Sequence, residues 1–136
     1  MTMETRRPGS ESAFRRFVSQ SRGATALEMA IVLPAFLMLV FGIEEFGRLF
    51  WLQSSLQYAV EQAARCAAVN TTLCGTAGAI TAYAADNVFG ASVPSADFTS
   101  STPACGHEIS VSYEFVFLMP AFFPPAVTLG AQSCHP

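Results

Sequence analysis

The most informative segment of this 136-residue chain is residues 22–48, which read RGATALEMAIVLPAFLMLVFGIEEFGR. From Ala24 to Ile43 the segment holds 20 residues, and Glu28 is the only charged one among them. A helix of that length spans roughly 30 Å, the thickness of the hydrocarbon core of a bilayer. The segment therefore predicts a membrane-spanning helix, which we place at residues 24–47.

The charged residues around this helix predict its orientation. The chain has seven arginines and no lysine, and five of the arginines lie within residues 1–22, whereas acidic residues prevail after the helix. By the positive-inside rule, residues 1–22 stay in the cytoplasm and residues after about 48 are exported. We therefore expect a single-pass membrane protein with an extracytoplasmic C-terminal part.

The composition also limits the classes of function. Only 12% of the residues are charged, against about 25% in an ordinary soluble domain. Few polar side chains remain for catalysis, so we expect neither an enzyme nor a bound cofactor. The part that follows the helix is acidic and lacks the basic face that nucleic-acid binding requires, which argues against a nucleic acid as partner.

The apolar run differs from the segments that export signals remove. No small-x-small cleavage site follows it, because Glu44-Glu45-Phe46 stands there instead. A lipoprotein signal is excluded as well, since Arg65 directly precedes Cys66. An uncleaved membrane anchor that carries a small exported binding domain remains one alternative.

A second alternative comes from the junction at Gly23, where the basic leader ends and the apolar helix begins. Glu28 lies five residues after Gly23, and a charge inside a membrane helix costs about 2.5–3.5 kcal/mol on insertion scales. If the chain is cut after Gly23, the new α-amine of Ala24 becomes a cation that Glu28 of a neighbouring subunit can neutralise. The competing interpretation is that Glu28 lies at the membrane edge and reaches water.

This junction resembles that of type IV prepilins, and in particular the TadE-like pseudopilins of the Tad/Flp pilus. The resemblance rests on Arg22–Pro34, Phe41–Arg48 and Ala63–Ala68. It implies cleavage after Gly23 by a prepilin peptidase, and a role with other pseudopilins and pilus assembly proteins in building an adhesive pilus. Major Flp pilins typically have Tyr after the Glu and are much shorter, whereas this chain has Met29. Both departures favour a minor component.

Apolar residues continue at 3–4 residue spacing from Leu49 to Ala67, which predicts one helical stripe in need of cover. The predicted organisation is a cleaved leader (1–23), the membrane helix (24–47), its extracytoplasmic continuation (48–69) and a small disulfide-bonded head (70–136). The expected class is α+β and pilin-like, with one long helix.

For the head we expect a second helix at about 75–89 and a two- or three-stranded antiparallel sheet. The clearest strand is 109–118, where apolar and polar residues alternate from Ile109 onward. A return strand is expected at 126–134, and residues 97–100 are a possible short strand.

All four cysteines follow the membrane helix, where export permits disulfides. The preferred pairs are Cys66–Cys74 and Cys105–Cys134, although strict strand alternation would place Cys105 and Cys134 on different faces unless Gly106 breaks the register. Zinc bound by Cys105, His107, Cys134 and His135 is the less favoured alternative, and we expect no metal.

The turn between the last two strands places Phe122 and Phe123 between prolines. Either these rings fold back on the long helix, or they form a contact surface for another pilus protein or for the membrane. Glu44 and Glu45 diverge on a helix and suggest no catalytic pair. They either mark the exit from lipid or pair with an arginine of a neighbouring helix.

Overall fold

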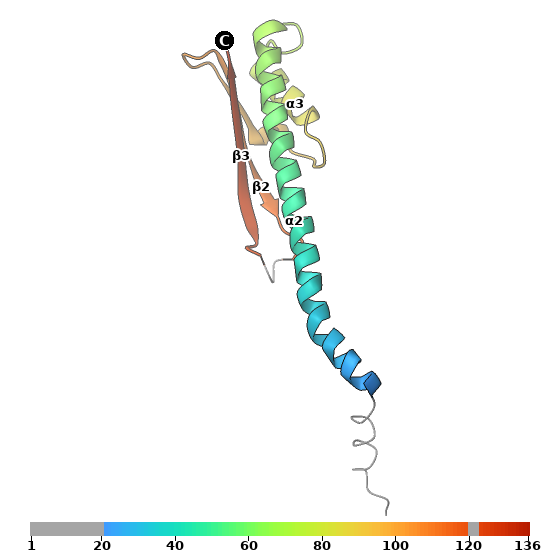
Figure 1. Ribbon diagram of the computed structural model, residues 1–136. Helices are drawn as coiled ribbons and strands as arrows, with labels where there is room; N and C mark the ends of the chain where they lie inside the picture. The colour runs from blue at the N-terminus through green and yellow to red at the C-terminus, as the bar shows by residue number, and fades with distance from the viewer. Residues whose placement is uncertain (1–20, 120–122) are drawn as a thin grey trace, which may run out of the picture. The chain divides into compact units, whose positions relative to one another are not determined.

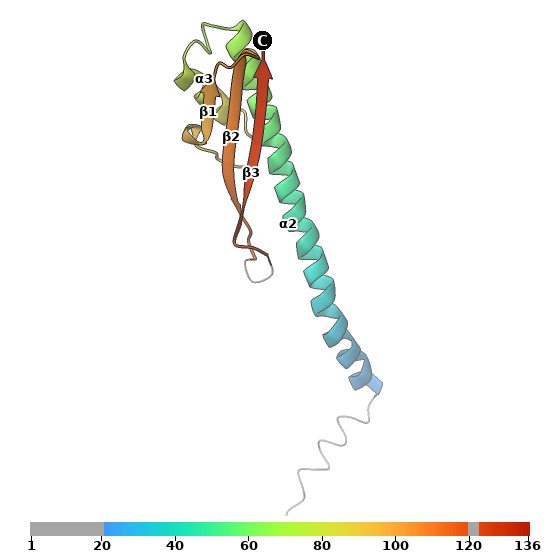
Figure 2. The same ribbon diagram turned by 90° about the vertical axis from the view of Figure 1, so that its left-hand side faces the viewer.

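The computed structural model describes residues 21–119 and 123–136, with side chains from residue 25 onward. Along the chain the elements are helix α2 (Ser21–Val69), helix α3 (Ala77–Asp86), the short 3-10 helix η1 (Ser95–Asp97), and strands β1 (Phe98–Ser101), β2 (His107–Val116) and β3 (Ala126–His135) (Figures 1 and 2). These elements confirm the predicted α+β class. Most of the predicted leader, and Phe122 of the turn, lie outside the described residues.

The chain divides into two compact units, Met1–Gly42 and Ile43–Pro136. In the first unit every described side chain from residue 25 to residue 41 is exposed, and nearly all of them are apolar. By length and apolar composition, α2 is the one helix in the described part of the chain that is able to cross a membrane. The finding agrees with the membrane helix that the sequence predicts.

In the second unit, which we call the C-terminal unit, α2 buries one stripe of its surface. With 3.6 residues per turn, side chains three and four apart share a face, and the predicted stripe is confirmed. Its buried members are Leu52, Leu56, Ala59, Val60, Ala63 and Ala67. Leu49, the first residue of the expected stripe, is half-buried against the same core.

The three strands form one antiparallel sheet in the order β1-β2-β3. Strand β2 pairs with β3 over its whole length, from His107↔His135 to Val116↔Ala126, and with the shorter β1 at Phe98↔Val111. Successive side chains point to opposite faces, so the predicted alternation buries Ile109, Val111 and Phe115. Helices α2 and α3 lie on this buried face of the sheet (Figure 1).

Two glutamine side chains connect α2 with the edge strand β3. The Nε2 of Gln53 donates to the carbonyl of Gly130 at 2.8 Å, and the Nε2 of Gln57 donates to the carbonyl of Gln132 at 3.4 Å. Both glutamines lie on the border of the buried stripe. They satisfy carbonyls on the outer edge of β3, where no further strand of the described residues supplies backbone donors.

Helix α3 is shorter than the predicted 75–89, and its capping residues explain the difference. The hydroxyl of Thr76 accepts a hydrogen bond from the N–H of Ala79 at 3.2 Å, so the helix begins after Thr76. At the other end the side chain of Asn87 donates to the carbonyl of Tyr83 at 2.8 Å and closes the last turn. The segment after Asn87 leaves the helix and runs back to α2, where the N–H of Phe89 donates to the Ser55 hydroxyl at 2.6 Å.

Candidate functional site

The predicted processing junction lies near the start of α2. Gly23 and Ala24 both have helical backbone, and Glu28 follows one turn later with its side chain exposed. Pro34 is also inside this helix, which continues through it to Val69. The junction and Glu28 thus belong to one helical segment, and the carboxylate of Glu28 faces outward from it.

A long apolar surface follows the junction on every side of α2. A helix that is apolar all round belongs either in a membrane or inside an assembly, because the exposure of so much apolar surface to water is unfavourable. In the first unit, the large side chains exposed by half of their surface or more are Leu27, Met29, Ile31, Val32, Leu33, Phe36, Met38 and Leu39. Within this surface Glu28 is the one charged residue.

Glu45 is the buried acid of the C-terminal unit, and it links α2 with the end of the β2–β3 hairpin. Its Oε1 accepts a hydrogen bond from the N–H of Leu118 at 2.8 Å. Its Oε2 accepts one from Nη1 of Arg48 at 3.0 Å. The Arg48 guanidinium also lies over the Phe115 ring, 5.4 Å from its centroid, where a cation is attracted by the π electrons.

These contacts show how the two adjacent acids differ within one chain. Glu44 is exposed, whereas Glu45 is buried and pairs with Arg48 of its own helix. The sequence offers the Glu45–Arg48 spacing of one helical turn. It gives no sign of the bond to Leu118, because the donor is a backbone N–H that any residue carries.

The turn after β2 folds back on α2 through Phe123. The Phe123 ring lies edge-on to Phe46, with centroids 5.9 Å apart, and stacks on Phe117 at 5.2 Å. Phe123 is partly buried against the core, so for this residue the structure shows the fold-back alternative. Phe122 lies outside the described residues.

Two aromatic-lined pockets lie on the C-terminal unit beside Trp51. The larger has a volume of about 440 Å³ and is lined by Arg48, Trp51, Tyr113 and Phe115, among others. The smaller has about 260 Å³ and lies between Trp51, Tyr58 and Phe89. Their walls offer ring faces and one guanidinium, which suits contact with an apolar or aromatic group of a partner better than chemistry on a substrate.

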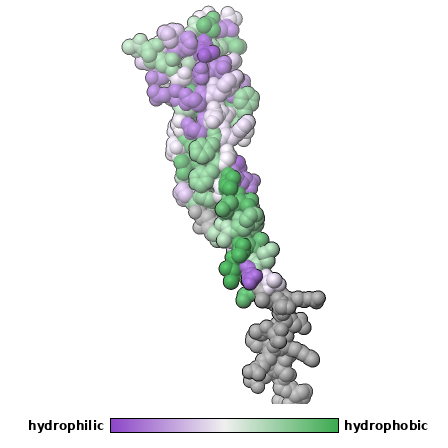
Figure 3. Space-filling view, in the orientation of Figure 1, coloured by the Kyte–Doolittle hydropathy of each residue, from purple (hydrophilic) through white to green (hydrophobic). Residues whose placement is uncertain are grey.

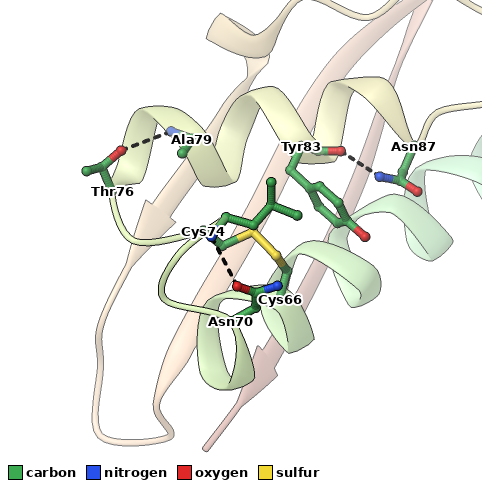
Figure 4. The surroundings of a disulfide bond; sticks show 8 residues. Cys66, Asn70, Cys74, Thr76, Ala79, Tyr83 and Asn87 are labelled. Atoms are coloured by element: carbon green, nitrogen blue, oxygen red, sulfur yellow. Dashed lines mark hydrogen bonds between the residues drawn. A yellow bond between two sulfur atoms is a disulfide. The ribbon is translucent and has the colours of Figure 1, made fainter.

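The first disulfide joins Cys66 to Cys74 and ties the last turn of α2 to the segment that leads to α3 (Figure 4). The Cα atoms are 5.8 Å apart. Beside it, the N–H of Cys74 donates to the carbonyl of Asn70 at 2.9 Å. The bridge and this hydrogen bond fix how the chain turns after α2.

The second disulfide joins Cys105 to Cys134 and closes a loop with a sequence separation of 29. Strict strand alternation would place Cys105 and Cys134 on different faces of the sheet, but strand β2 begins only at His107. Gly106 has a φ of 116°, which turns the chain out of the strand, so alternation does not determine the direction of the Cys105 side chain. Both pairings are those that the sequence favours. They also leave no thiolate at Cys105 or Cys134 for the zinc alternative, since a disulfide sulfur is not a thiolate.

Comparison with known proteins adds the family of the N-terminal part. The family model described as "TadE-like protein" matches residues 23–65, from the junction glycine through most of α2. No curated protein and no solved structure matches the chain. One apolar helix near the N-terminus, together with this match, indicates a single-pass membrane protein associated with a Tad pilus system. Over residues 23–65 the chain is therefore similar to TadE-like proteins, in agreement with the resemblance of its sequence motifs.

Proposed function

We propose that this chain is a minor pseudopilin of a Tad/Flp pilus, cut after Gly23 by a prepilin peptidase. Helix α2 anchors it in the inner membrane, with the leader in the cytoplasm and the C-terminal unit outside. Its partners are then the peptidase, other pseudopilins and pilus assembly proteins. The role is one of assembly and involves no catalysis by this chain.

The observation that carries the proposal is the junction itself. A basic leader ends in Gly23, the apolar surface of α2 follows at once, and the TadE-like match begins at the same residue. A glycine before the scissile bond leaves the peptide accessible, because it has no side chain. The proposal also explains the exposed carboxylate of Glu28, since a cationic α-amine on a neighbouring subunit can neutralise it inside the membrane.

The competing function is an uncleaved membrane protein whose exported unit binds another molecule. The two aromatic-lined pockets beside Trp51 favour binding by that unit. Binding and assembly are not exclusive, because a pseudopilin also needs partner surfaces. The two functions differ in whether the leader is removed and in whether pili depend on the chain.

The test compares Gly23→Val with the matched control Gly47→Val in cells that make the pilus. A Cβ at Gly47 meets no atom within 4 Å, so the control tests a valine in α2 away from the junction. We expect Gly23→Val to accumulate in membranes with its leader attached and to lower piliation. The control should lose its leader like the wild type.

Two results would overturn the proposal. In the first, Gly23→Val is cut before Ala24 as efficiently as the wild type. In the second, a deletion of the chain leaves the number of pili unchanged. Loss of processing in a strain without the prepilin peptidase would identify the enzyme responsible.

A further inference from the structure

The turn end of the hairpin formed by β2 and β3 lies beside Glu45 and Phe46 of α2. The N–H of Leu118 lies 2.8 Å from Oε1 of Glu45, and Phe123 contacts Phe46. The predicted hydrocarbon-spanning run ends at Ile43, and Glu45 is two residues later, a rise of about 3 Å along a helix. The polar headgroup layer on each side of the hydrocarbon is several ångströms thick. If α2 crosses the membrane as proposed, this end of the hairpin lies at headgroup depth.

The surface at that end is apolar where a water-facing turn would be polar. Val116 and Leu118 are exposed by 61% and 69%, and Val127 across the hairpin and Phe46 on α2 are exposed as well. We call Phe46, Val116, Leu118 and Val127 the hairpin end. Turns in water are usually built from Gly, Asn, Asp and Ser, but residues 115–127 include no polar side chain. Polar residues gather instead around the opposite end of the unit, near the C-terminus (Figure 3).

The charges near the hairpin end are arranged for a medium of low polarity. Glu45 is buried, and both of its carboxylate oxygens accept hydrogen bonds, one of them from the Arg48 guanidinium. Arg48 in turn lies over Phe115. Glu44 is exposed, and because it is two residues from Phe46 it lies about 200° around α2 from that ring, on nearly the opposite side. Near the hairpin end, Glu45 and Arg48 are paired with each other, and Glu44 lies on another side of α2.

We propose that the hairpin end is inserted in the headgroup layer of the exported membrane face, so that the C-terminal unit has a second contact with lipid besides helix α2. The inference rests on the proposed membrane anchoring of α2 and not on pilus assembly. We assign lipid as the partner of this surface because the hydrogen bond from the N–H of Leu118 to Glu45 holds the hairpin end close to the end of the apolar run. Two contacts with the bilayer would restrict rotation of the unit about α2.

The test uses quenching of tryptophan fluorescence by lipids brominated near the headgroup end of their acyl chains. Trp51 is the one tryptophan of the chain and is replaced first by Phe. Single tryptophans are then introduced by Leu118→Trp at the hairpin end, Leu37→Trp in the apolar run and Thr102→Trp as the matched control. All three sites are exposed. The full chain is reconstituted in vesicles of phosphatidylethanolamine and phosphatidylglycerol.

Thr102 follows β1 at the opposite end of the sheet. That end is separated from Val116 by the length of β2, about 30 Å for its ten residues. We expect brominated lipid to reduce the emission of Leu118→Trp and of Leu37→Trp, and to leave that of Thr102→Trp unchanged. The control also shows that tryptophan does not by itself draw the unit to lipid. Val116→Trp provides a second position in case Leu118→Trp alters the fold.

The outcomes separate the two proposals. Quenching at Leu37→Trp without quenching at Leu118→Trp or Val116→Trp would overturn the inference and leave the anchoring intact. Absence of quenching at Leu37→Trp would overturn the anchoring and the inference with it. Protection of the hairpin-end tryptophans from both brominated lipid and aqueous iodide would show that a second protein chain covers them, which also overturns the inference.

Discussion

Glu45 connects two segments that are far apart in the sequence, and its removal tests that connection. Glu45→Gln keeps the size of the side chain but loses the ion pair with Arg48, and its amide nitrogen then faces either the Arg48 guanidinium or the N–H of Leu118, both of which can only donate. Hydrogen bonds to charged groups contribute about 1.5–3 kcal/mol each, so we expect a loss of about 1–2 kcal/mol in the free energy of unfolding.

The measurement is denaturant unfolding of the full chain in detergent, followed by the fluorescence of Trp51. Glu44→Gln is the matched control, because Glu44 is exposed and its substitution should change stability by less than about 0.5 kcal/mol. Equal effects of the two substitutions would mean that the buried contacts of Glu45 contribute nothing to folding.

Gly106 has a backbone conformation that other residues seldom adopt. Its φ is 116°, and a Cβ there would approach the backbone of His135 and Pro136. Gly106→Ala should therefore destabilise the unit by about 1–3 kcal/mol and slow the pairing of Cys105 with Cys134 during oxidative refolding. Gly47→Ala, where a Cβ meets open space inside helix α2, should not lower stability and should leave the rate of pairing unchanged. Free-thiol titration during refolding, together with unfolding curves, checks the prediction.

At the scale of the elements, the two disulfides should contribute different amounts to the free energy of unfolding. In the chain-entropy model a bridge restrains the unfolded chain more when the loop it closes is longer. The sequence separations are 29 for Cys105–Cys134 and 8 for Cys66–Cys74. Replacing both cysteines of a pair by serine should therefore cost about 3–4 kcal/mol for the longer loop and about 2–3 kcal/mol for the shorter. A larger loss from Cys66→Ser with Cys74→Ser, measured by the same unfolding assay, would contradict this order.

The elements also show which features a sequence can predict. The α2 stripe and strand β2 were predictable because burial on one face leaves a period of 3.6 or 2 in the sequence. The ends of α3 were not, since the apolar pattern continues past the caps at Thr76 and Asn87. The partners of Glu45 were only half predictable. Arg48 lies one turn away, but the N–H of Leu118 is 73 residues distant and leaves no trace in the sequence.

For the whole molecule, Glu28 should matter for assembly and not for insertion. Glu28→Gln removes the charge within the apolar run, so the helix should enter the membrane at least as well as the wild type. Pairing with the α-amine of Ala24 on a neighbouring subunit would be lost, and we expect fewer pili. Glu44→Gln, the same change outside the run, is the control and should leave piliation intact. The assay is alkaline extraction of membranes together with a count of pili by electron microscopy. Full piliation by Glu28→Gln would make the proposed pairing unnecessary.

The central claim is that this chain is processed at Gly23, and the N-terminus of the membrane-bound protein tests it most directly. The wild-type chain is extracted from the membranes of cells that contain the prepilin peptidase, and its intact mass and N-terminal sequence are determined. The account predicts a chain that begins at Ala24. A membrane-bound chain that still carries residues 1–23 would contradict it.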